Sequence, residues 1–441
     1  MFKKNTLFLF FTALIILFST TSSLSFAAGI KEGWKVPVNG KYAFFALPQA
    51  DGSLVYIDGT EQSYGTLTVV YHIDIMNISQ KGTVNKTWGL EAEQIFVGQA
   101  GKKQYVVSVK NEKGVVAAYD LNGKKLWEHK VGAAITWIDQ YKDTTYLKTK
   151  NTMIMLDSKG KRIGSLKITN YPVIGPDGCI YITNYPDSPY ITSDSKGKQV
   201  TLLKYNKLGK LQWKVNIPPM KNQKGWDIQY HTYNEIYVDK KYVYVNISYT
   251  LSQTNPSYVS KTVKMINAID SKGKIAWSVK SNQEADSSFS LSIAVKDYKN
   301  GSLSFEGNTV YFIDKKGKKS KYFETKNGYV EFVNDGYMLL RNNQSVTLMS
   351  LELKRKWTVK YPQEAYLDFI GKSIVIFTSY PSYESEDPYG LYSKSFYLFE
   401  NGKQIGLYKP TTQIRIVAID EKTRTIYVKH NKTNLLQVLK Y

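Results

Sequence analysis

Ala118-Tyr-Asp-Leu-Asn-Gly-Lys-Lys-Leu-Trp127 and Ala268-Ile-Asp-Ser-Lys-Gly-Lys-Ile-Ala-Trp277 are two copies of one pattern, with Ala, Asp, Gly, Lys and Trp at identical offsets. Each copy joins an apolar run to a second run through a turn, whose Gly supplies the positive φ that a tight hairpin needs. Internal repetition of this kind indicates an architecture built from repeated supersecondary units.

Weaker copies of the pattern recur along the chain, at Leu156–Arg162, Tyr205–Trp213, Ile313–Lys318, Leu351–Trp357 and Phe399–Lys403. Between the copies lie short alternating or β-branched runs that are typical of strands, such as Gln104–Val109, Lys241–Ile247 and Ser373–Thr378. Four short strands in each unit of roughly 40–50 residues are typical of a β-propeller blade.

The strand quartets give nine candidate units, the last made by residues 414–441 with Trp34–Val38 as its fourth strand. We predict an all-β chain with a single closed β-propeller over residues 29–441, shut by pairing of its N- and C-terminal strands. Because propellers typically have four to eight blades, we expect about eight four-stranded blades, within a range of seven to nine. Terminal pairing would leave no exposed strand edge at the seam.

The Ala-x-Asp-x-x-Gly-Lys-x-x-Trp copies resemble the tryptophan-docking repeat of the pyrroloquinoline-quinone-like propeller family. The resemblance implies that Trp127, Trp213, Trp277 and Trp357 pack between neighbouring blades. The family includes quinone-dependent dehydrogenases that carry an adjacent Cys pair over the cofactor, whereas this chain has only Cys179. The resemblance therefore bears on fold more than on activity.

The N-terminus has the three parts of a secretory signal: Lys3 and Lys4, an apolar run from Leu7 to Phe18, and small residues ending at Ala27 and Ala28. We predict that residues 1–28 are a signal peptide cleaved near Ala27 or Ala28. The mature protein is then expected to be secreted or associated with the cell envelope, without a transmembrane segment.

The composition narrows the classes of partner. One Cys in 441 residues excludes a disulfide framework and Cys-rich zinc modules. The net charge is +22, and removal of the signal, with two lysines and no acid, leaves +20. Such a charge suits an anionic neighbour, and export favours a cell-wall or surface polymer over nucleic acid. The alternative is that scattered lysines only keep a large β-protein soluble.

The Gly-Lys turns concentrate cations between the third and fourth strands of the blades. We predict that this edge binds polyanions through residues that include Lys124, Lys125, Lys161, Arg162, Lys274, Lys315, Lys316, Lys318 and Lys319. The intervening acids, such as Asp120 and Asp270, are expected to brace their own turns. The alternative role of the cations is protection of the outer strands against edge-to-edge association.

The loops between second and third strands emerge at the opposite edge, and several are long and rich in Tyr, Ser and Pro. Tyrosine offers a flat apolar ring with a polar tip, which suits sugar rings and peptide segments. We predict ligand contacts from Tyr185, Tyr190, Tyr249, Tyr258, Tyr383, Tyr389 and Tyr392. The alternative is that these tyrosines pack locally under their own loops.

Motifs of catalysis are missing from the sequence. It contains no Gly-x-Ser-x-Gly elbow, Walker loop or His-Glu-x-x-His, and its four histidines have no zinc-site spacing. We predict no catalytic residues, no metal site and no cofactor. The leading hypothesis is an exported, non-catalytic binding or scaffold protein of the cell envelope, with a polyanion on one edge and a glycan, peptide or protein on the other.

Two other functions stay open. The first is a quinone-dependent or sugar-acting enzyme that uses the central channel of the propeller. The second is an envelope assembly scaffold similar to the propeller lipoprotein of outer-membrane biogenesis, although no Cys follows the apolar run to carry a lipid.

Overall fold

A computed structural model describes residues 30–61, 69–100, 103–111, 113–183, 200–221, 224–253, 259–285, 294–334, 336–362, 365–371, 373–379 and 392–441. Every regular element in these ranges is a β-strand, and the strands form nine four-stranded sheets. The predicted signal peptide lies outside the described residues. No helix in the described ranges is long and apolar enough to cross a bilayer.

Each sheet is an antiparallel meander of four strands, here named a to d, which is the blade of a β-propeller. The a–b and c–d turns lie at one end of a sheet, called the turn edge below, and the b–c loop lies at the other end, called the loop edge. The sheets fall into two compact units.

The first unit contains three sheets, and one of them joins the two ends of the chain. Its strands are β34 (Ile414–Asp420), β35 (Thr425–His430), β36 (Leu435–Lys440) and β1 (Lys31–Pro37); β2 (Tyr42–Pro48), β3 (Leu54–Glu61), β4 (Tyr71–Ile78) and β5 (Val84–Ala92); and β30 (Ala365–Ile370), β31 (Ile374–Ser379), β32 (Phe396–Glu400) and β33 (Lys403–Tyr408).

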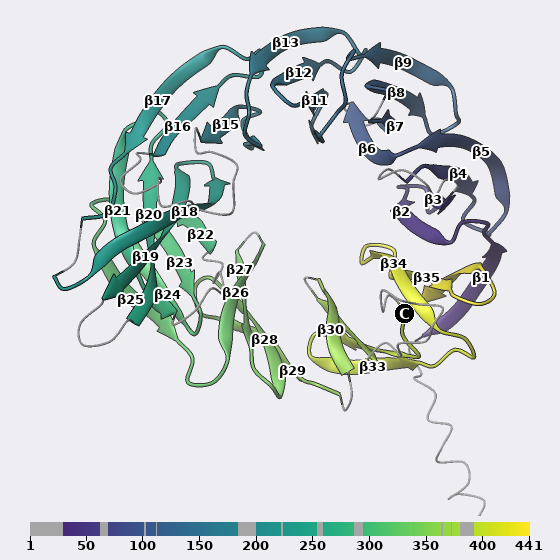
Figure 1. Ribbon diagram of the computed structural model, residues 1–441. Coiled ribbons are helices and arrows are strands. Elements are labelled where there is room, and N and C mark those ends of the chain that lie inside the picture. Colours follow the sequence, from purple (N-terminus) through teal and green to yellow (C-terminus); the bar gives the residue numbers. More distant parts are fainter. Residues whose placement is uncertain are drawn as a thin grey trace, which may run out of the picture. The chain divides into compact units, whose positions relative to one another are not determined.

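In the terminal sheet, β1 pairs antiparallel with β36, and Val36 lies opposite Leu436. Figure 1 shows β1, from the start of the described chain, in the same part of the fold as β34 and β35 from its end, and β36 lies between β1 and β35 in the sheet. The predicted pairing of Trp34–Val38 with the C-terminal strand is therefore confirmed. Its buried side chains, including Val36, Tyr427 and Val438, form one core cluster with Leu54 and Tyr56 of the next sheet.

The second unit contains the other sheets, and the chain passes between the units within β5 and β29. Its strands are β6 (Gln94–Ala100), β7 (Lys103–Lys110), β8 (Val115–Asp120) and β9 (Lys125–Lys130); β10 (Trp137–Tyr141), β11 (Thr144–Lys148), β12 (Thr152–Leu156) and β13 (Arg162–Lys167); β14 (Val173–Ile174), β15 (Ile180–Thr183), β16 (Val200–Tyr205) and β17 (Leu211–Ile217); β18 (Asp227–Val238), β19 (Val243–Gln253), β20 (Val259–Ile269) and β21 (Ile275–Ala285); β22 (Ala294–Tyr298), β23 (Gly301–Glu306), β24 (Thr309–Asp314) and β25 (Lys319–Glu324); and β26 (Tyr329–Asn334), β27 (Tyr337–Arg341), β28 (Ser345–Ser350) and β29 (Arg355–Lys360).

The described residues thus hold nine blades, at the upper end of the predicted range and one above the expected eight. The expected number came from the usual size of propellers. The nine quartets counted along the sequence, with the terminal one completed by β1, match the sheets.

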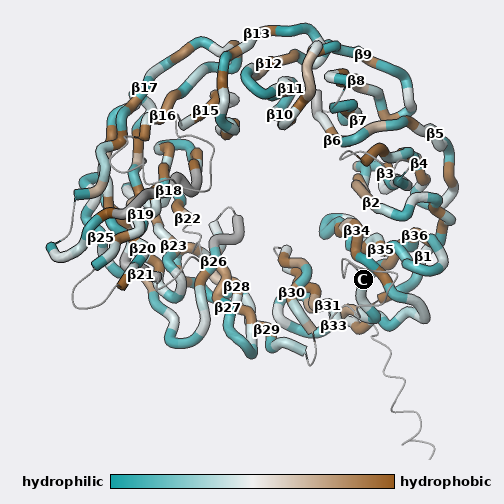
Figure 2. The backbone as a smooth tube through the Cα atoms, viewed as in Figure 1, coloured by the Kyte–Doolittle hydropathy of each residue, from teal (hydrophilic) through white to brown (hydrophobic). Residues whose placement is uncertain are grey.

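Burial follows the position of a strand within its sheet. The second strands β11, β15, β23 and β31 are almost wholly buried, whereas outer strands such as β17 alternate between exposed and partly buried residues. Figure 2 shows this interleaving of hydrophilic and hydrophobic residues along β17. The pattern arises because a d strand has one face against the neighbouring sheet and the other in water.

The Gly-Lys turns share one geometry. The Asp120 carboxylate accepts the backbone N–H groups of Asn122 and Lys124 at 2.9 Å, and Gly123 has a φ of 84°. Asp157, Asp270 and Asp314 make the same pair of bonds. The prediction that these acids brace their own turns is confirmed.

The repeat tryptophans dock on the glycine of the next turn, as the resemblance predicts. A Cβ added to Gly160 would lie 2.6 Å from the ring of Trp127, and one added to Gly273 would lie 2.8 Å from Trp213. Trp277 and Trp357 stand in the same relation to Gly317 and Gly402. Each contact lies within one unit, since the boundary in β29 falls before Trp357 and places it with Gly402 in the first unit. Each contact fixes a turn against a tryptophan of the preceding outer strand.

Candidate functional site

The Gly-Lys turns carry exposed cations at equivalent positions in successive sheets. Of the predicted polyanion residues, Lys124, Lys125, Lys161, Arg162, Lys274, Lys315, Lys316 and Lys318 are exposed. All of them belong to c–d turns or to the first residues of d strands, so each lies at the turn edge of its own sheet. Within the second unit the docked tryptophans bring neighbouring turns and outer strands into contact.

Most of the exposed turn lysines form no close ion pair, because the nearby carboxylates accept backbone N–H groups instead. Among the described residues, no ion pair involves Lys124, Lys161, Lys274 or any of the three exposed lysines at 315, 316 and 318, whereas Lys125 pairs with Glu128 at 3.1 Å. In the turn after β24, hydrogen bonds from the amides of Lys318 and Lys316 lower the pKa of Asp314, so this carboxylate stays ionised.

Lys319 has a different role from the one predicted. Its ammonium lies 2.7 Å from Oε1 of Glu306, whose side chain is 0% exposed, and 4.1 Å from the centroid of the Tyr311 ring. Ser281 and Ser304 donate their hydroxyls to the same carboxylate. Lys319 is thus the partner that the buried Glu306 carboxylate needs. No pattern in the sequence indicates this pairing, because Glu306 lies on another strand.

Most of the predicted ligand tyrosines, Tyr185, Tyr190, Tyr258, Tyr383 and Tyr389, lie outside the described residues. Tyr249 was expected in a loop, but it lies in β19, is 2% exposed and belongs to a hydrophobic core cluster. Tyr392 is 8% exposed and is therefore buried as well. The expectation of an exposed ring is wrong for both. For Tyr249 the reason is that β19 runs to Gln253 and carries the chain beyond the predicted end of the strand.

A cavity of about 360 Å³ opens at the loop edge between the sheets β10–β13 and β14–β17. Its lining includes Asn151, Lys167 and Thr183, with Leu203 and Tyr205 from β16. The Asn170 side chain, which also lines it, donates to the Thr183 carbonyl oxygen at 2.7 Å. The Asn170 amide is therefore already engaged within the protein.

A second cavity, of about 320 Å³, lies at the turn edge between the sheets β14–β17 and β18–β21. We call it the inter-sheet cavity. Its lining is Pro176, Asp177, Tyr181, Lys204 and Trp213 from the first sheet and Asp239, Lys240, Lys241, Tyr242, Val243, Ile269 and Ser271 from the second. Ser271 belongs to the Gly-Lys turn that begins at Asp270, so this cavity and the turn cations share an edge.

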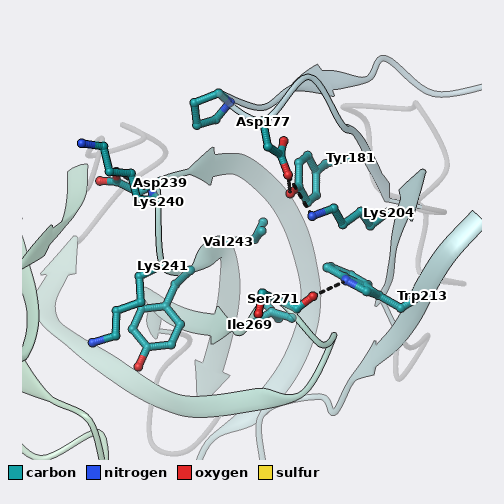
Figure 3. Close-up of a pocket in the computed structure, with 12 residues that line it drawn as sticks. Asp177, Tyr181, Lys204, Trp213, Asp239, Lys240, Lys241, Val243, Ile269 and Ser271 are labelled. Carbon is teal, nitrogen blue, oxygen red and sulfur yellow. Dashed lines mark hydrogen bonds and ion pairs between the residues drawn. The ribbon is translucent and has the colours of Figure 1, made fainter. Parts of the chain in front are cut away.

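Asp177, Tyr181 and Lys204 form a polar cluster on one wall of the cavity (Figure 3). The Lys204 ammonium lies 2.8 Å from Oδ2 of Asp177, which also accepts the Tyr181 hydroxyl at 3.0 Å. Oδ1 accepts the backbone N–H of Cys179 at 3.0 Å. Burial opposes the charge on Asp177 and Lys204, but their mutual contact outweighs it, so the pKa of Asp177 is lowered and that of Lys204 is raised.

Trp213 forms the apolar part of the same wall. Its indole N–H donates to the Ser271 carbonyl oxygen at 3.0 Å, which fixes the ring, and its centroid lies 6.2 Å from that of Tyr181. Val243 and Ile269 of the other sheet, both almost wholly buried, lie across the cavity. The cavity therefore combines one aromatic ring with an adjacent acceptor and donor.

The lysines of the opposite wall turn away from this cluster. Figure 3 shows the ammonium ends of Lys240 and Lys241 on the far side from Trp213 and Lys204. The Lys241 ammonium lies 5.0 Å from the centroid of the Tyr242 ring, and Asp239 pairs with Lys296 at 3.1 Å. The charges that face the interior are those of Asp177 and Lys204, which balance each other.

Sequence reasoning missed Asp177, Lys204 and Trp213 as a site. Trp213 was identified for docking alone, and Asp177 and Lys204 are separated by 27 positions in the chain. The one available signal was that Asp177 and Asp239 each occupy an a–b turn of consecutive sheets. Their convergence on one cavity depends on how the two sheets pack.

Cys179 lies beside this cluster as a partly buried free thiol. Burial and the neighbouring Asp177 carboxylate raise its pKa to about 11. A thiol of this kind is protonated at neutral pH and is a poor nucleophile. Within the described ranges there is no group of three or more His, Cys, Asp or Glu side chains placed to hold a metal ion.

Comparison with known sequences finds no match, because neither a family model nor a curated protein matches this chain. Solved structures do resemble it. BamB from Moraxella catarrhalis is 11% identical with a TM-score of 0.37, over 93% of this chain and 100% of that one. The dihydro-heme d1 dehydrogenase NirN is 11% identical with a TM-score of 0.40, over 75% of this chain and 69% of that one.

The Hsv2 protein of Kluyvelomyces marxianus is 11% identical with a TM-score of 0.31, over 79% of this chain and 94% of that one. BamB and NirN are β-propeller proteins, as the blades of this chain would lead one to expect. Similarities at this level support no argument about activity, ligand or partner.

Proposed function

We propose that this chain is a non-catalytic, exported binding protein of the cell envelope that holds an anionic polymer along its Gly-Lys turns. The observation that carries the proposal is the braced turn. The carboxylates of the turns accept backbone N–H groups, and they belong to Asp120, Asp157, Asp270 and Asp314. The lysines beside them are exposed and form no ion pair among the described residues. A row of such turns offers positive charge at a repeated spacing to a chain of negative groups.

Edge protection alone explains this arrangement less well. Lysines that protect an edge are needed along the d strands, whose backbone is unpaired. Here the densest group, Lys315, Lys316 and Lys318, lies in the turn ahead of β25 rather than along that strand. Contacts with a glycan, peptide or protein partner are proposed for the remaining predicted tyrosines, Tyr185, Tyr190, Tyr258, Tyr383 and Tyr389.

The test is binding of heparin and of polygalacturonate, as sulfated and carboxylated probe polymers, at low and high salt. Interactions of exposed charges weaken as the screening length falls, from about 10 Å at 0.1 M to about 3 Å at 1 M ionic strength. The variant Lys315→Gln/Lys316→Gln/Lys318→Gln removes three charges from one turn. If each contact contributes roughly 0.3–1 kcal/mol, the affinity falls at least about five-fold.

A matched control removes the same charge from the other edge. Lys130, Lys167 and Lys360 are exposed and end the d strands β9, β13 and β29, so they lie at the loop edge. The triple Gln variant at these positions is expected to bind both polymers nearly as the parent does. Equal losses in the two triple variants would show that only the total charge matters, and the proposed turn-edge site would be wrong.

A further inference from the structure

The inter-sheet cavity has the chemistry of a site for one sugar ring. Its volume, about 320 Å³, is at the lower end of the range for small-molecule pockets, which suits a ligand of about one ring. Its lining brings the indole of Trp213 next to a carboxylate and an ammonium. A pyranose presents apolar C–H groups on its faces and hydroxyls around its rim, and both kinds of surface find a counterpart here.

We propose that the inter-sheet cavity binds a single hexopyranose unit, with a face of the ring against Trp213 and two neighbouring hydroxyls on Asp177 and Lys204. One hydroxyl donates to the Asp177 carboxylate and the next accepts from the Lys204 ammonium. Because Asp177 and Lys204 lie 2.8 Å apart at the cavity wall, the two groups match adjacent hydroxyls of one ring. Hydrogen bonds to charged partners are the stronger ones.

The cluster is held rigidly enough to select a ligand. Asp177 is fixed by the Cys179 amide and the Tyr181 hydroxyl, and Trp213 is fixed by Ser271 and by its packing on Gly273. The exposed fraction of the side chain is 42% for Asp177 and 15% for Lys204, so the carboxylate keeps accessible surface while Lys204 lies along the wall. Preorganised donors and acceptors lose little entropy on binding.

A simple anion fits the cavity less well. The Lys204 charge is already balanced by Asp177, and Lys240 and Lys241 point away from the cluster (Figure 3). A phosphate group would therefore meet a carboxylate as well as an ammonium at the wall. A hydroxyl, which both donates and accepts, is compatible with both.

Sugar binding in the inter-sheet cavity is an interaction in addition to the proposed polymer binding, and it does not depend on that binding. It shares the turn edge with the Gly-Lys turns through Ser271, so a unit of a bound polysaccharide could enter it. Its contacts with a neutral sugar are short-range and are expected to change little with salt. Loss of polymer binding in the lysine variants and loss of sugar binding in the cavity are thus separate outcomes.

The experiment titrates the full chain with methyl β-glucopyranoside, methyl β-glucuronide, cyclohexanemethanol and inorganic phosphate. The readout is the indole N–H signal of Trp213 in an NMR spectrum, assigned by Trp213→Phe. We expect both glycosides to shift this signal with a Kd in the millimolar range, as expected for the small area that one ring buries. Cyclohexanemethanol and phosphate are expected to leave it unchanged.

Asp177→Asn and Lys204→Gln are each expected to weaken glycoside binding about ten-fold or more, since each removes a charged hydrogen-bond partner. Glu128→Gln and Lys125→Gln, which make the same changes in the ion pair on β9, are the controls. Should Asp177→Asn or Lys204→Gln unfold the protein, Tyr181→Phe, which keeps both charges and removes one donor to Asp177, gives a milder test of the same carboxylate.

Four results would overturn the proposal. They are the absence of any glycoside shift, a shift with cyclohexanemethanol equal to that with the glycosides, a shift with phosphate alone, and unchanged glycoside affinity in folded Asp177→Asn. A glucuronide that binds more tightly than the glucoside would support it and would place an acidic sugar in the cavity.

Discussion

Gly164 and Leu208 approach so closely that a Cβ on Gly164 would lie 2.3 Å from the Leu208 carbonyl oxygen. Gly164 lies in β13 at the position where other copies of the repeat have their Trp. In those copies the indole fills the space beside the next turn. Here the backbone of the turn that begins at Asn206 packs directly against β13. The two sheets therefore stay in contact without a large side chain between them.

Gly164→Ala is accordingly expected to lower the free energy of unfolding by about 1–3 kcal/mol, because backbone atoms cannot yield to an added methyl group. Urea denaturation measures the change. Gly89→Ala in β5 is the matched control, since its Cβ would meet only the ends of Asp74 and His72 at 3.3 Å. Equal stability of Gly164→Ala and the parent would mean that the two sheets pack less closely than described.

Replacing the turn acids by asparagine is expected to strengthen polymer binding without loss of stability. Asn206 already accepts the amides of Leu208 and Lys210 at 3.0 Å, so an amide oxygen braces this turn as well as a carboxylate does. The quadruple Asn variant of Asp120, Asp157, Asp270 and Asp314 removes four negative charges from the turn edge.

Its melting temperature should match that of the parent, and its affinity for heparin at low salt should rise several-fold. Isothermal titration calorimetry with heparin measures the affinity, and differential scanning calorimetry measures the melting temperature. An unchanged affinity would show that the polymer does not contact these turns.

Stability is expected to fall as the pH rises from about 4 to about 6, because of Asp58. Its side chain is buried, Oδ2 accepts the Gly40 N–H at 2.9 Å, and burial raises its pKa to about 6. Lys429, whose ammonium donates to the carbonyl oxygens of Gly40 and Lys41, opposes that shift in part. The folded state therefore holds a proton on Asp58 that the unfolded chain, with an ordinary pKa of 3.8, has released.

Below pH 4 the proton on Asp58 adds up to about 3 kcal/mol to the free energy of unfolding, a figure that follows from the size of the pKa shift. This contribution is lost as the pH rises through 6. The Asp58→Asn variant has no titrating group at this position, so its free energy of unfolding should vary less between pH 4 and pH 6 than that of the parent. Denaturation curves at pH 4, 5, 6 and 7 for the two proteins test this. Parallel curves would rule out Asp58 as the source.

Cys179 is expected to react slowly with iodoacetamide in the folded protein. A pKa of about 11, against an ordinary 9.0, leaves about 100-fold less thiolate at neutral pH. Comparison of alkylation rates in buffer and in guanidinium chloride, followed by mass spectrometry, gives the ratio. Similar rates in the two conditions would contradict the raised pKa of Cys179, and a faster rate in the folded protein would indicate an activated thiol and reopen the question of covalent chemistry.

The sequence by itself determined the repeated unit and its turns. The Asp-x-x-Gly-Lys spacing sets a local geometry, since the Asp side chain reaches amides only two and four residues ahead, and Gly alone readily takes the positive φ. The Trp at the seventh position after Asp recurs at a fixed spacing, and its docking on the glycine of the following turn was predicted from the resemblance to a known repeat. From these signals the strands, the docking tryptophans and the terminal pairing of β1 with β36 could be predicted.

Only the tertiary structure decided which side chains form the inter-sheet cavity and the buried ion pair. Asp177 and Lys204 lie in different strands, and the walls of their cavity come from two sheets, so no spacing in the chain encodes the site. The same reason explains two of the corrected roles: Lys319 pairs with Glu306 and Tyr249 joins a core because of partners distant in sequence. Local rules fix a turn through covalent proximity, whereas a cavity and a buried ion pair depend on packing between segments that the chain brings together only when it folds.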